Sequence, residues 1–488
     1  MGRRFDSCRG RQPYNVAESS RSLRPLLRAA FLLYIVLTVI VTLHHEAWGD
    51  EADPWLLMRD GGMSVMLSRG GYRGTPALWY IVIAPFASAG LPYLSQQLLN
   101  LAFIWFAVFL FLKHSPFTPA VKVLFLFGYY AFSEYAVKAR QYALLIALLF
   151  AIVALWTRRR ERPLLIAVLV ALLANTAVHG LIFAAVIGLV FAIDAIGRRD
   201  VTRRANIAAM VIMIVGGLAC VAQLLPAPDG QKLPRFLDPQ TIPWSIGTAF
   251  LPFVDMRYSF VAGLLIFLAA VIAIGDRTLP LVFTTVSIAA LLVLYQFVLV
   301  GGYRHTGLIL IVLLAGVWMA LGEVRPQQPS RLKAFRTLEV ALALCFAWSV
   351  YANVRDAVDE IRFAHSGSRE MAAYIAGNVH PSTIIAAHRP YHCAPTLVYL
   401  PGRLFWFPAY GRFGSYTLWD RAFQDGQSLA YEPAIDAARR QLAGRNWLLL
   451  INHEMPENER GFRLLYTNRI PVYSTHRDER YWLYKPVG

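Results

Sequence analysis

Successive apolar runs are the feature of this sequence that most restricts its fold. A transmembrane helix needs roughly 17–25 mostly apolar residues, and runs along most of the chain meet or nearly meet that length. They are 26–43, 91–112, 120–135, 141–156, 163–178, 181–196, 205–225, 260–274, 279–300, 306–321 and 338–351. Hydrophobic residues make up 57% of the 488 residues and charged residues 16%. A soluble globular chain has roughly 45–50% and about 25%, so the sequence predicts an α-helical polytopic membrane protein with about 11 transmembrane helices.

The positions of Lys and Arg predict the orientation of these spans, because cytoplasmic loops collect both residues. A basic arm covers residues 1–25, and further basic clusters lie at 158–160, 198–204 and 325–336. All of them fall on one side of the membrane if 76–90, which is short and contains Pro85, is an interfacial helix. We therefore expect a cytoplasmic N-terminus and an extracytoplasmic C-terminus. The net charge of +17 then reports orientation, and no nucleic-acid partner is expected.

This topology divides the chain into three parts. The arm is followed by a transmembrane domain, 26–354, whose first outer loop is 44–90, and by a tail, 355–488. Two pieces of the tail, 383–387 and 447–451, are typical of strands, while 368–377 and 433–443 have helical patterns. Alternating helix and strand predict a small C-terminal α/β domain on the outer side.

Acidic residues are scarce in this chain but gather directly after the first span. Asp53 and Pro54 have a structural explanation as the N-cap and first residue of a helix over 55–60. Asp50 and Glu51 precede that cap, and one of them can serve as a general base or bind a metal ion. A solvated loop explains this pair equally well. His44 and His45 are either metal ligands or interfacial residues, and Trp48 and Trp55 are expected in an interfacial aromatic belt.

Basic residues at two later outer tips break the positive-inside trend. At the tip 133–142, Glu134 and Lys138 can form an i,i+4 pair, whereas Arg140 has no local partner. Arg304 and His305 lie at the outer end of a later span, and arginine binds phosphate through two parallel hydrogen bonds. Snorkelling to lipid headgroups is the alternative for each arginine. One acidic and two basic tips on the same side indicate a shared site, which His179 can also line.

These segments resemble the GT-C class of polytopic glycosyltransferases, which use polyprenyl-phosphate sugars. The class includes protein O-mannosyltransferases and the aminoarabinose transferases that modify lipid A. Its first outer loop opens with an Asp-Glu pair before a juxtamembrane helix, which is similar to GDEADPW at 49–55. A second juxtamembrane helix and the next outer tip of the class are similar to TPALWY at 75–80 and ARQYAL at 139–144. The resemblance covers about 26–321 in outline.

The resemblance implies an inverting transfer of a sugar from a polyprenyl-phosphate carrier to a lipid, glycan or protein acceptor at the outer face of a bacterial inner (plasma) membrane. Asp50 matches the general base of the class, with Glu51 as its neighbour. The other matched residues are Arg140, Lys138, Arg304 and His305 for the donor phosphate, with Glu134 and Tyr142 in support; His179 supports the site by its position alone. The class often has Lys or His where this chain has Thr75, and Arg73 is the expected substitute. No cofactor is fixed, and a divalent metal ion on Asp50 and Glu51 is left open.

Two other classes of function fit a chain of this composition. A transporter or flippase of a lipid-linked or anionic substrate also has many spans, but places its ionisable residues near the middle of the membrane. A non-catalytic membrane assembly protein would bind its partner through the tail, for example through Tyr391 or Trp419. Both residues are more typical of the core and rim of an α/β domain.

Overall fold

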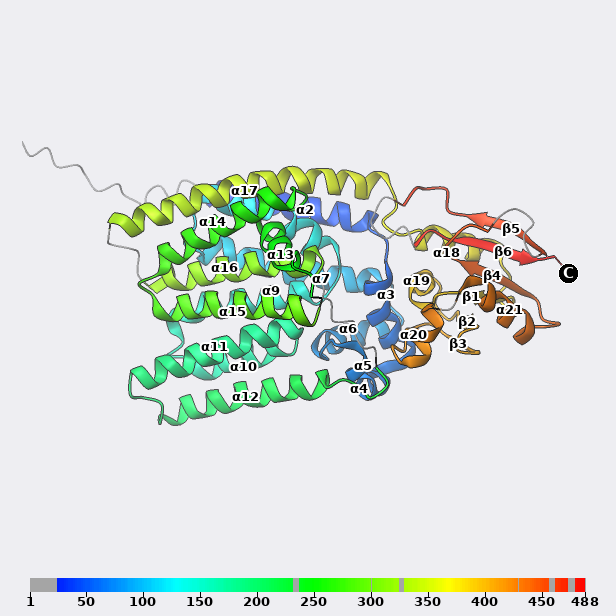
Figure 1. Cartoon of the computed structure of the whole chain (residues 1–488), viewed down its shortest axis with the longest axis horizontal. Helices are drawn as coiled ribbons and strands as arrows, with labels where there is room; N and C mark the ends of the chain where they lie inside the picture. Colours follow the sequence, from blue (N-terminus) through cyan, green and yellow to red (C-terminus); the bar gives the residue numbers. More distant parts are fainter. Residues whose placement is uncertain are drawn as a thin grey trace, which may run out of the picture.

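A computed structural model of the chain describes residues 24–230, 237–299, 301–323, 329–428, 430–455, 461–472 and 479–487. Most of the basic arm and residues 324–328 of the last basic cluster lie outside these ranges. The described chain forms a bundle of long apolar helices, with a sheet-containing C-terminal domain at one end (Figure 1). The expected polytopic helical protein with a small C-terminal α/β domain is thus present.

Most helices of the bundle run along its length (Figure 1). The bundle helices are α2 (Arg24–His44), α7 (Leu94–His114), α8 (Pro119–Leu126), α9 (Tyr142–Leu155), α10 (Pro163–Ala174), α11 (Val178–Gly197), α12 (Arg204–Leu224), α14 (Met256–Ile274), α15 (Thr278–Phe297), α16 (Tyr303–Glu323) and α17 (Pro329–Arg362). Helix α13 (Thr241–Phe250) packs against α14 and α16. Each expected apolar run overlaps one of these bundle helices.

The expected number of about 11 full spans is only partly reproduced. Within the described ranges, 8 helices are long and apolar enough to cross a membrane, and a bent pair can add a ninth. That pair joins Pro119–Val137 to Tyr142–Arg158 at an angle of 118°. Helix α10 has 12 residues and rises only about 18 Å, less than the roughly 30 Å of a bilayer core. The segment Tyr130–Val137 continues α8 as a π-helix, which a hydropathy pattern does not reveal.

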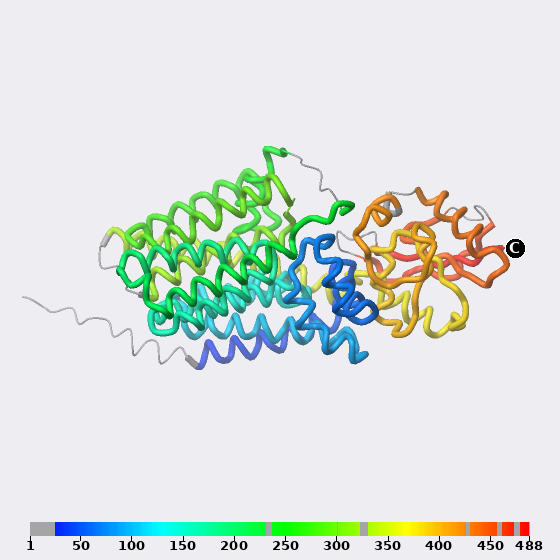
Figure 2. Tube along the Cα trace, turned by 90° about the horizontal axis from the view of Figure 1, so that it is seen from below, coloured from blue at the N-terminus to red at the C-terminus, as the bar shows by residue number. Residues whose placement is uncertain are grey.

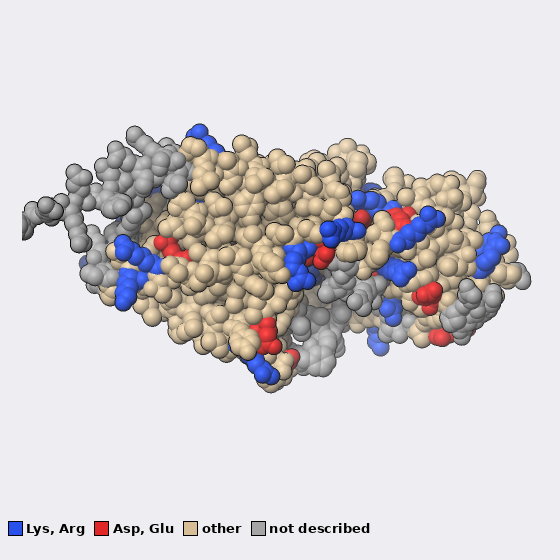
Figure 3. Space-filling view, turned by 90° about the horizontal axis from the view of Figure 1, so that it is seen from above, with Lys and Arg blue, Asp and Glu red and all other residues tan. Residues whose placement is uncertain are grey.

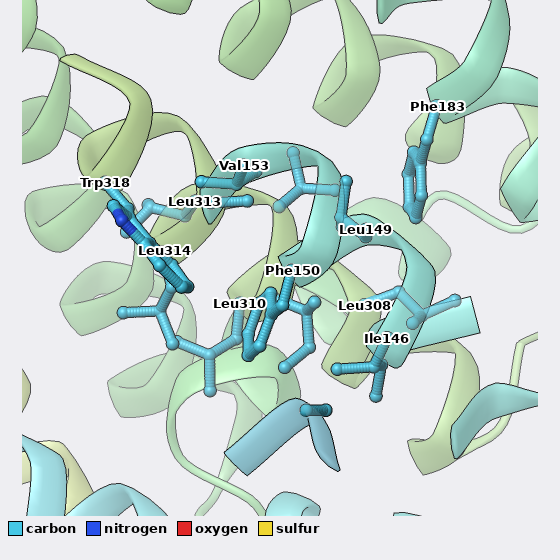
Figure 4. Close-up of a cluster of buried hydrophobic side chains, with 14 of the residues drawn as sticks. Ile146, Leu149, Phe150, Val153, Phe183, Leu308, Leu310, Leu313, Leu314 and Trp318 are labelled. Atoms are coloured by element: carbon cyan, nitrogen blue, oxygen red, sulfur yellow. The ribbon is translucent and has the colours of Figure 1, made fainter. Parts of the chain in front are cut away.

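Helix α16 lies in the middle of the bundle and is buried along nearly its whole length. Its Trp318 meets Phe150 of α9 edge to face, with ring centroids 5.6 Å apart (Figure 4). On the other side, Gly316 lies directly against Thr284 of α15. Because α16 begins with Tyr303-Arg304-His305, packing of this helix also positions Arg304 at the end of the bundle.

On the face shown in Figure 3, a broad band of the bundle surface carries few charged side chains. The α9–α10 and α11–α12 connections lie at the end of the bundle opposite the C-terminal domain (Figure 1). Two of the predicted basic clusters meet there at Asp194. Its carboxylate accepts a hydrogen bond from Arg159 at 2.9 Å and forms an ion pair with Arg198 at 3.1 Å. The apolar band and the basic end match the pattern of a multi-pass protein in a membrane.

The first loop, 44–90, folds into short helices at the other end of the bundle. They are α3 (Gly49–Leu56), a π-helical turn (Leu57–Gly61), α4 (Gly62–Ser68), α5 (Gly70–Arg73) and α6 (Leu78–Ser88). The segment 76–90 contains the short helix α6, which has 11 residues and is too short to be a full span, as expected. The expected helix start at Asp53 is wrong, since α3 begins at Gly49 and includes both Asp53 and Pro54. Trp48 and Trp55 are buried, so the expected interfacial belt is also wrong for them.

The C-terminal domain follows α17 and contains a six-stranded mixed sheet of order β3-β2-β1-β4-β6-β5. Its strands are β1 (Ile384–Ala387), β2 (Phe405–Phe407), β3 (Arg412–Gly414), β4 (Trp447–Ile451), β5 (Phe462–Thr467) and β6 (Trp482–Pro486). Its helices are α18 (Ser368–Asn378), α19 (Pro390–Cys393), a 3-10 segment (Ala394–Tyr399), α20 (Arg421–Ser428) and α21 (Tyr431–Gln441). Strands β1 and β4 pair in parallel, so both predicted strands and both predicted helices of the tail are confirmed.

The two faces of this sheet have different partners. Ala386 and Leu449 face α21, whereas Ile385 and Leu448, their neighbours in the pleat, face α18 and the first loop. The second face shares one continuous hydrophobic cluster with α3 and α6. Figure 2 shows the first loop between the bundle and the C-terminal domain. The first loop is therefore the layer through which the domain is joined to the bundle.

The contact between Gly316 and Thr284 gives a test of the bundle. A Cβ atom at position 316 would overlap Oγ1 of Thr284, so Gly316→Ala must separate α15 from α16 or move the threonine side chain. We expect a loss of about 1–3 kcal/mol, as is usual for an overpacked core, measured as a lower Tm of the purified protein. Gly197→Ala is the control, since nothing lies within 4 Å of its new methyl group. An unchanged Tm for Gly316→Ala would contradict this packing.

Candidate functional site

A cavity of about 450 Å³ lies at the end of the bundle that carries the first loop. Its walls come from the first loop, the link between the π-helical segment and α9, the starts of α11 and α16, and the C-terminal domain. The predicted site residues that line it are Asp50, Arg73, Arg140, Tyr142, His179, Arg304 and His305. The three predicted tips thus meet at one cavity, although they are far apart in the sequence.

Asp50 is the charged centre of this cavity. Its Oδ2 lies 2.6 Å from a guanidinium nitrogen of Arg140 and 2.6 Å from one of Arg304. Tyr391 donates a hydrogen bond of 2.5 Å to Oδ1 of the same carboxylate. Burial alone would raise the pKa of Asp50, but the two arginines and Tyr391 hold it well below its usual value. Asp50 is therefore ionised at neutral pH.

The helical geometry of α3 explains why only one residue of the predicted acidic pair faces the cavity. Successive residues of an α-helix point about 100° apart, whereas residues three apart share a face. Asp50 and Asp53 accordingly both line the cavity. Glu51 points into the protein, is fully buried, and accepts a hydrogen bond from the backbone N–H of Ala139. The expectation that Glu51 is catalytic is not supported by this position, since Glu51 does not line the cavity.

Asp53 and Arg73 form a second ion pair at the wall of the cavity. The backbone N–H of Thr417 donates to Asp53 at 3.0 Å, and Arg73 donates to the carbonyl oxygen of Thr417 at 2.5 Å. Trp419 Nε1 also donates to Asp53, at 3.2 Å. Asp53 therefore connects the first loop to the C-terminal domain, and Arg73, expected at the donor phosphate, already has a carboxylate partner.

Glu134 and Lys138 lie close to the cavity but do not line it. Lys138 Nζ is 2.6 Å from Glu134, so the i,i+4 pair is confirmed, and Tyr129 donates to the same carboxylate at 2.9 Å. Glu134 is buried in the π-helical segment. The expectation that Lys138 binds the donor phosphate is thus not supported, because its ammonium group is used within its own segment.

Two histidines form the far wall of the cavity. The rings of His179 and His305 are stacked, with centroids 5.3 Å apart and planes at 11°. Both rings also contact Tyr142. His305 Nδ1 accepts the backbone N–H of Gly302 at 2.8 Å, whereas neither ring nitrogen of His179 has a hydrogen-bond partner in the part of the chain that the structure describes. His179 therefore presents unused polar atoms inside the cavity.

The C-terminal domain contributes residues that the sequence did not predict for the site. Tyr391 of α19 and Trp419 line the cavity, and their rings meet with centroids 5.3 Å apart. Gly49 lies against the ring of Tyr391, since a Cβ there would be 2.6 Å from it. Glu479 accepts the backbone N–H of Gly49 at 2.7 Å. No local sequence signal could identify these residues, because more than 300 positions separate them from Asp50.

His45 belongs to a buried polar cluster behind α3. Its Nε2 lies 2.8 Å from Glu51, and its Nδ1 lies 2.6 Å from Glu360 of α17. Glu360 also faces His365 Nδ1 at 3.3 Å. Burial alone would lower the pKa of His45, but the two carboxylates raise it to about 10. His44 is exposed at the end of α2, so the two adjacent histidines have different surroundings.

The metal site left open at Asp50 and Glu51 does not fit this geometry. Asp50 is already neutralised by two guanidinium groups, and Glu51 points to the other side of α3. A divalent cation beside Asp50 would face Arg140 and Arg304 at close range. These two carboxylates therefore do not act together on one ion.

Comparison of the sequence with models of known protein families and with curated proteins gave no match. The geometry of the cavity and the physical chemistry of its residues are therefore the basis for a functional assignment.

The raised pKa of buried Glu479 predicts that the stability of the protein depends on pH. Burial raises its pKa from the usual 4.5 to about 8, so the folded protein favours the protonated acid. The resulting stabilisation is complete below pH 4.5 and is lost as the pH rises through 8, by at most about 1.4 kcal/mol per pH unit. Glu479→Gln should therefore flatten the fall of Tm between pH 5 and 9.

Glu454→Gln is the control for this measurement, because Glu454 is an exposed acid of the same domain. A fall of Tm that is equally steep in wild type, Glu479→Gln and Glu454→Gln would show that Glu479 does not titrate in this range.

Proposed function

We propose that the protein is a membrane glycosyltransferase of GT-C type, which moves a sugar from a polyprenyl-phosphate carrier to an acceptor hydroxyl. The observation that carries this proposal is the carboxylate of Asp50 held between Arg140 and Arg304 in a cavity at the end of an apolar helix bundle. Polyprenyl phosphate is a good leaving group, so this reaction needs a base for the acceptor and cations for the phosphate. The cavity contains both.

The two arginines are arranged for a phosphate. Both guanidinium groups reach the same oxygen of Asp50, at 2.6 Å each, so they converge on one anion. Guanidinium groups form strong paired hydrogen bonds with phosphate as well as with carboxylate. The donor phosphate would bind between Arg140 and Arg304, where Asp50 now pairs with both.

Exchange of these partners would activate Asp50. While both arginines pair with it, its pKa lies well below the usual value and it is a weak base. Binding of the donor phosphate draws the guanidinium charge away from the carboxylate, which raises the pKa of Asp50 and increases its basicity. The base thus becomes effective only when the donor is present.

The proposed chemical step is a single displacement. The acceptor oxygen bonds to C1 of the sugar as the bond from C1 to the phosphate oxygen breaks, and the acceptor proton passes to Asp50. The leaving polyprenyl phosphate gains negative charge, which Arg140 and Arg304 stabilise. Attack opposite the leaving group inverts the configuration at C1. No metal ion is needed to balance the charges of this step.

A second cavity gives the lipid part of the donor a place beside the first. It has a volume of about 340 Å³ and is lined by α6, α10 and α12, mainly through Leu78, Val168 and Ile212. Leu78 and Gln223 in this cavity are sequence neighbours of Trp79 and Leu224 in the first. An apolar surface among membrane helices suits a polyprenyl chain, and its position would leave the phosphate at the arginines.

The proposed orientation is based on the two ends of the bundle. Arg159 and Arg198 lie at the end away from the cavity, and cytoplasmic loops collect such residues. We therefore infer that the cavity and the C-terminal domain are on the extracytoplasmic side of a bacterial plasma membrane. A transporter would instead need its charged residues near the middle of the bundle.

Replacement of Asp50 tests the base. Asp50→Asn keeps the shape of the side chain but cannot take the acceptor proton, so the transfer rate should fall about 10²–10⁴-fold. The measurement uses protein in lipid vesicles with a polyprenyl-phosphate sugar and an envelope lipid fraction as acceptor. Asp60→Asn is the matched control, since Asp60 is in the same loop and pairs with Arg59 and Ser415 outside the cavity.

Wild-type turnover by Asp50→Asn would exclude Asp50 as the base. Movement of the lipid-linked sugar across the vesicle membrane, without any product, would instead favour the flippase alternative.

Replacement of the arginines tests the phosphate site. Arg140→Ala and Arg304→Ala should each lower kcat/KM for the donor by roughly 100-fold, with a much smaller change in the KM of the acceptor. Arg257→Ala is the control, because Arg257 is exposed at the start of α14. Equal losses for donor and acceptor in both cavity variants would contradict a phosphate role for these arginines.

A further inference from the structure

Three chain segments meet on the side of α3 away from the cavity, in a cluster that takes no part in the proposed sugar transfer. His45 follows α2, Glu360 lies near the end of α17, and His365 lies in the link from α17 to the C-terminal domain. All three side chains are buried. One ligand atom of each lies within 4.8 Å of those of the other two, across more than 300 positions of sequence.

These three residues form a donor set that is typical of zinc. Two imidazoles and one carboxylate are the protein ligands of many four-coordinate zinc sites, whereas magnesium and calcium prefer oxygen ligands alone. The His45 Nδ1 atom lies 2.6 Å from one Glu360 oxygen, and His365 Nδ1 lies 3.3 Å from the other. Two ligands bound to zinc at about 2.0–2.1 Å lie about 3.3 Å apart, so an ion requires only a small separation of His45 from Glu360.

Glu51 supplies the outer support that such a site needs. Histidines bound to a metal usually donate their second ring N–H to a carboxylate, which fixes the tautomer and the orientation of the ring. His45 Nε2 lies 2.8 Å from Glu51, and this leaves Nδ1 on the side of Glu360 and His365. Glu51 itself is held by the backbone N–H of Ala139. The position of Glu51, away from the cavity, thus has a specific use.

The balance of charge around the cluster also favours a cation. Glu51 and Glu360 are buried on either side of His45, and Glu46 accepts the backbone N–H of His365 at 2.9 Å. Arg369 is 4.0 Å from Glu46 and is half exposed. Buried carboxylates need a paired charge or a metal ion, and a divalent ion would neutralise them more completely than one imidazolium.

We propose that His45, Glu360 and His365 bind a zinc ion that fastens the first loop to the C-terminal domain. The same two segments are also joined by hydrogen bonds, since the Ser368 hydroxyl donates to the carbonyl of Ala47 at 2.7 Å and Arg369 donates to that of His45 at 2.7 Å. The ion ties the segment that precedes Asp50 to the domain that carries Tyr391. Its role is structural, and it is independent of the proposed sugar transfer.

The test uses full-length, tag-free protein in detergent, stripped with a chelator and reloaded with zinc or cobalt. Wild-type protein should bind about one zinc ion per chain, measured by mass spectrometry of the metal, and zinc should raise its Tm. Cobalt in the same site should give the visible absorption of a tetrahedral complex. His365→Gln and Glu360→Gln should lose the bound metal, the absorption and the rise in Tm.

Two further variants make the test specific. His44→Gln is the matched control, since His44 is exposed and adjacent to His45, and it should bind zinc like wild type. Glu51→Gln should keep the stoichiometry but bind zinc about 10–100-fold more weakly, because it removes only the outer carboxylate. Both results are read from metal content and affinity, so they do not depend on transfer activity.

Two outcomes would overturn the proposal. The first is a wild-type protein that takes up neither zinc nor cobalt and keeps the same Tm with either ion or chelator, which would leave His45 as an imidazolium between Glu51 and Glu360. The second is zinc retained at full stoichiometry by both His365→Gln and Glu360→Gln, which would place the ion elsewhere.

Discussion

The pairing of Asp50 with Arg140 and Arg304 is the interaction on which the rest of the site depends. Charged groups that are largely removed from water are costly unless they are paired, and these three come from a loop, a bend between helices and the start of α16. They can meet only after the bundle has assembled around α16. The same packing that buries α16 therefore also brings Arg304 to Asp50.

Different faces of helix α3 contact two separate parts of the protein. One face carries Asp50 and Asp53 to the cavity, and the opposite face carries Glu51 to the cluster around His45. The C-terminal domain contacts the cavity face directly through Tyr391. It reaches the Glu51 face through His45, whose ring contacts His365, so both faces are held in place. The domain is thus part of the site and not an appendage to the bundle.

Hydropathy and charge were sufficient to predict the bundle, the shortness of α6, and the meeting of Asp50 with Arg140 and Arg304, and strand-like segments predicted β1 and β4. These features depend on local composition or on the side of the membrane. The roles of Tyr391, Trp419 and His365 could not be predicted, because each depends on a contact across more than 300 residues. The predicted helix start at Asp53 is wrong because Asp-Pro is a strong local cap signal, whereas here Asp53 is used for tertiary contacts with Arg73 and Thr417.

The positions of the two cavities also restrict how two substrates can meet under the proposed function. The apolar cavity lies among the bundle helices α6, α10 and α12, so under the proposed function the donor would arrive from the side of the bundle. Tyr391 and Trp419 form the wall of the Asp50 cavity on the side of the C-terminal domain. Under the proposed function, an acceptor would therefore approach Asp50 from the side of the C-terminal domain. Under the proposed function, the donor and the acceptor would then reach Asp50 from different sides, as a single displacement with inversion requires.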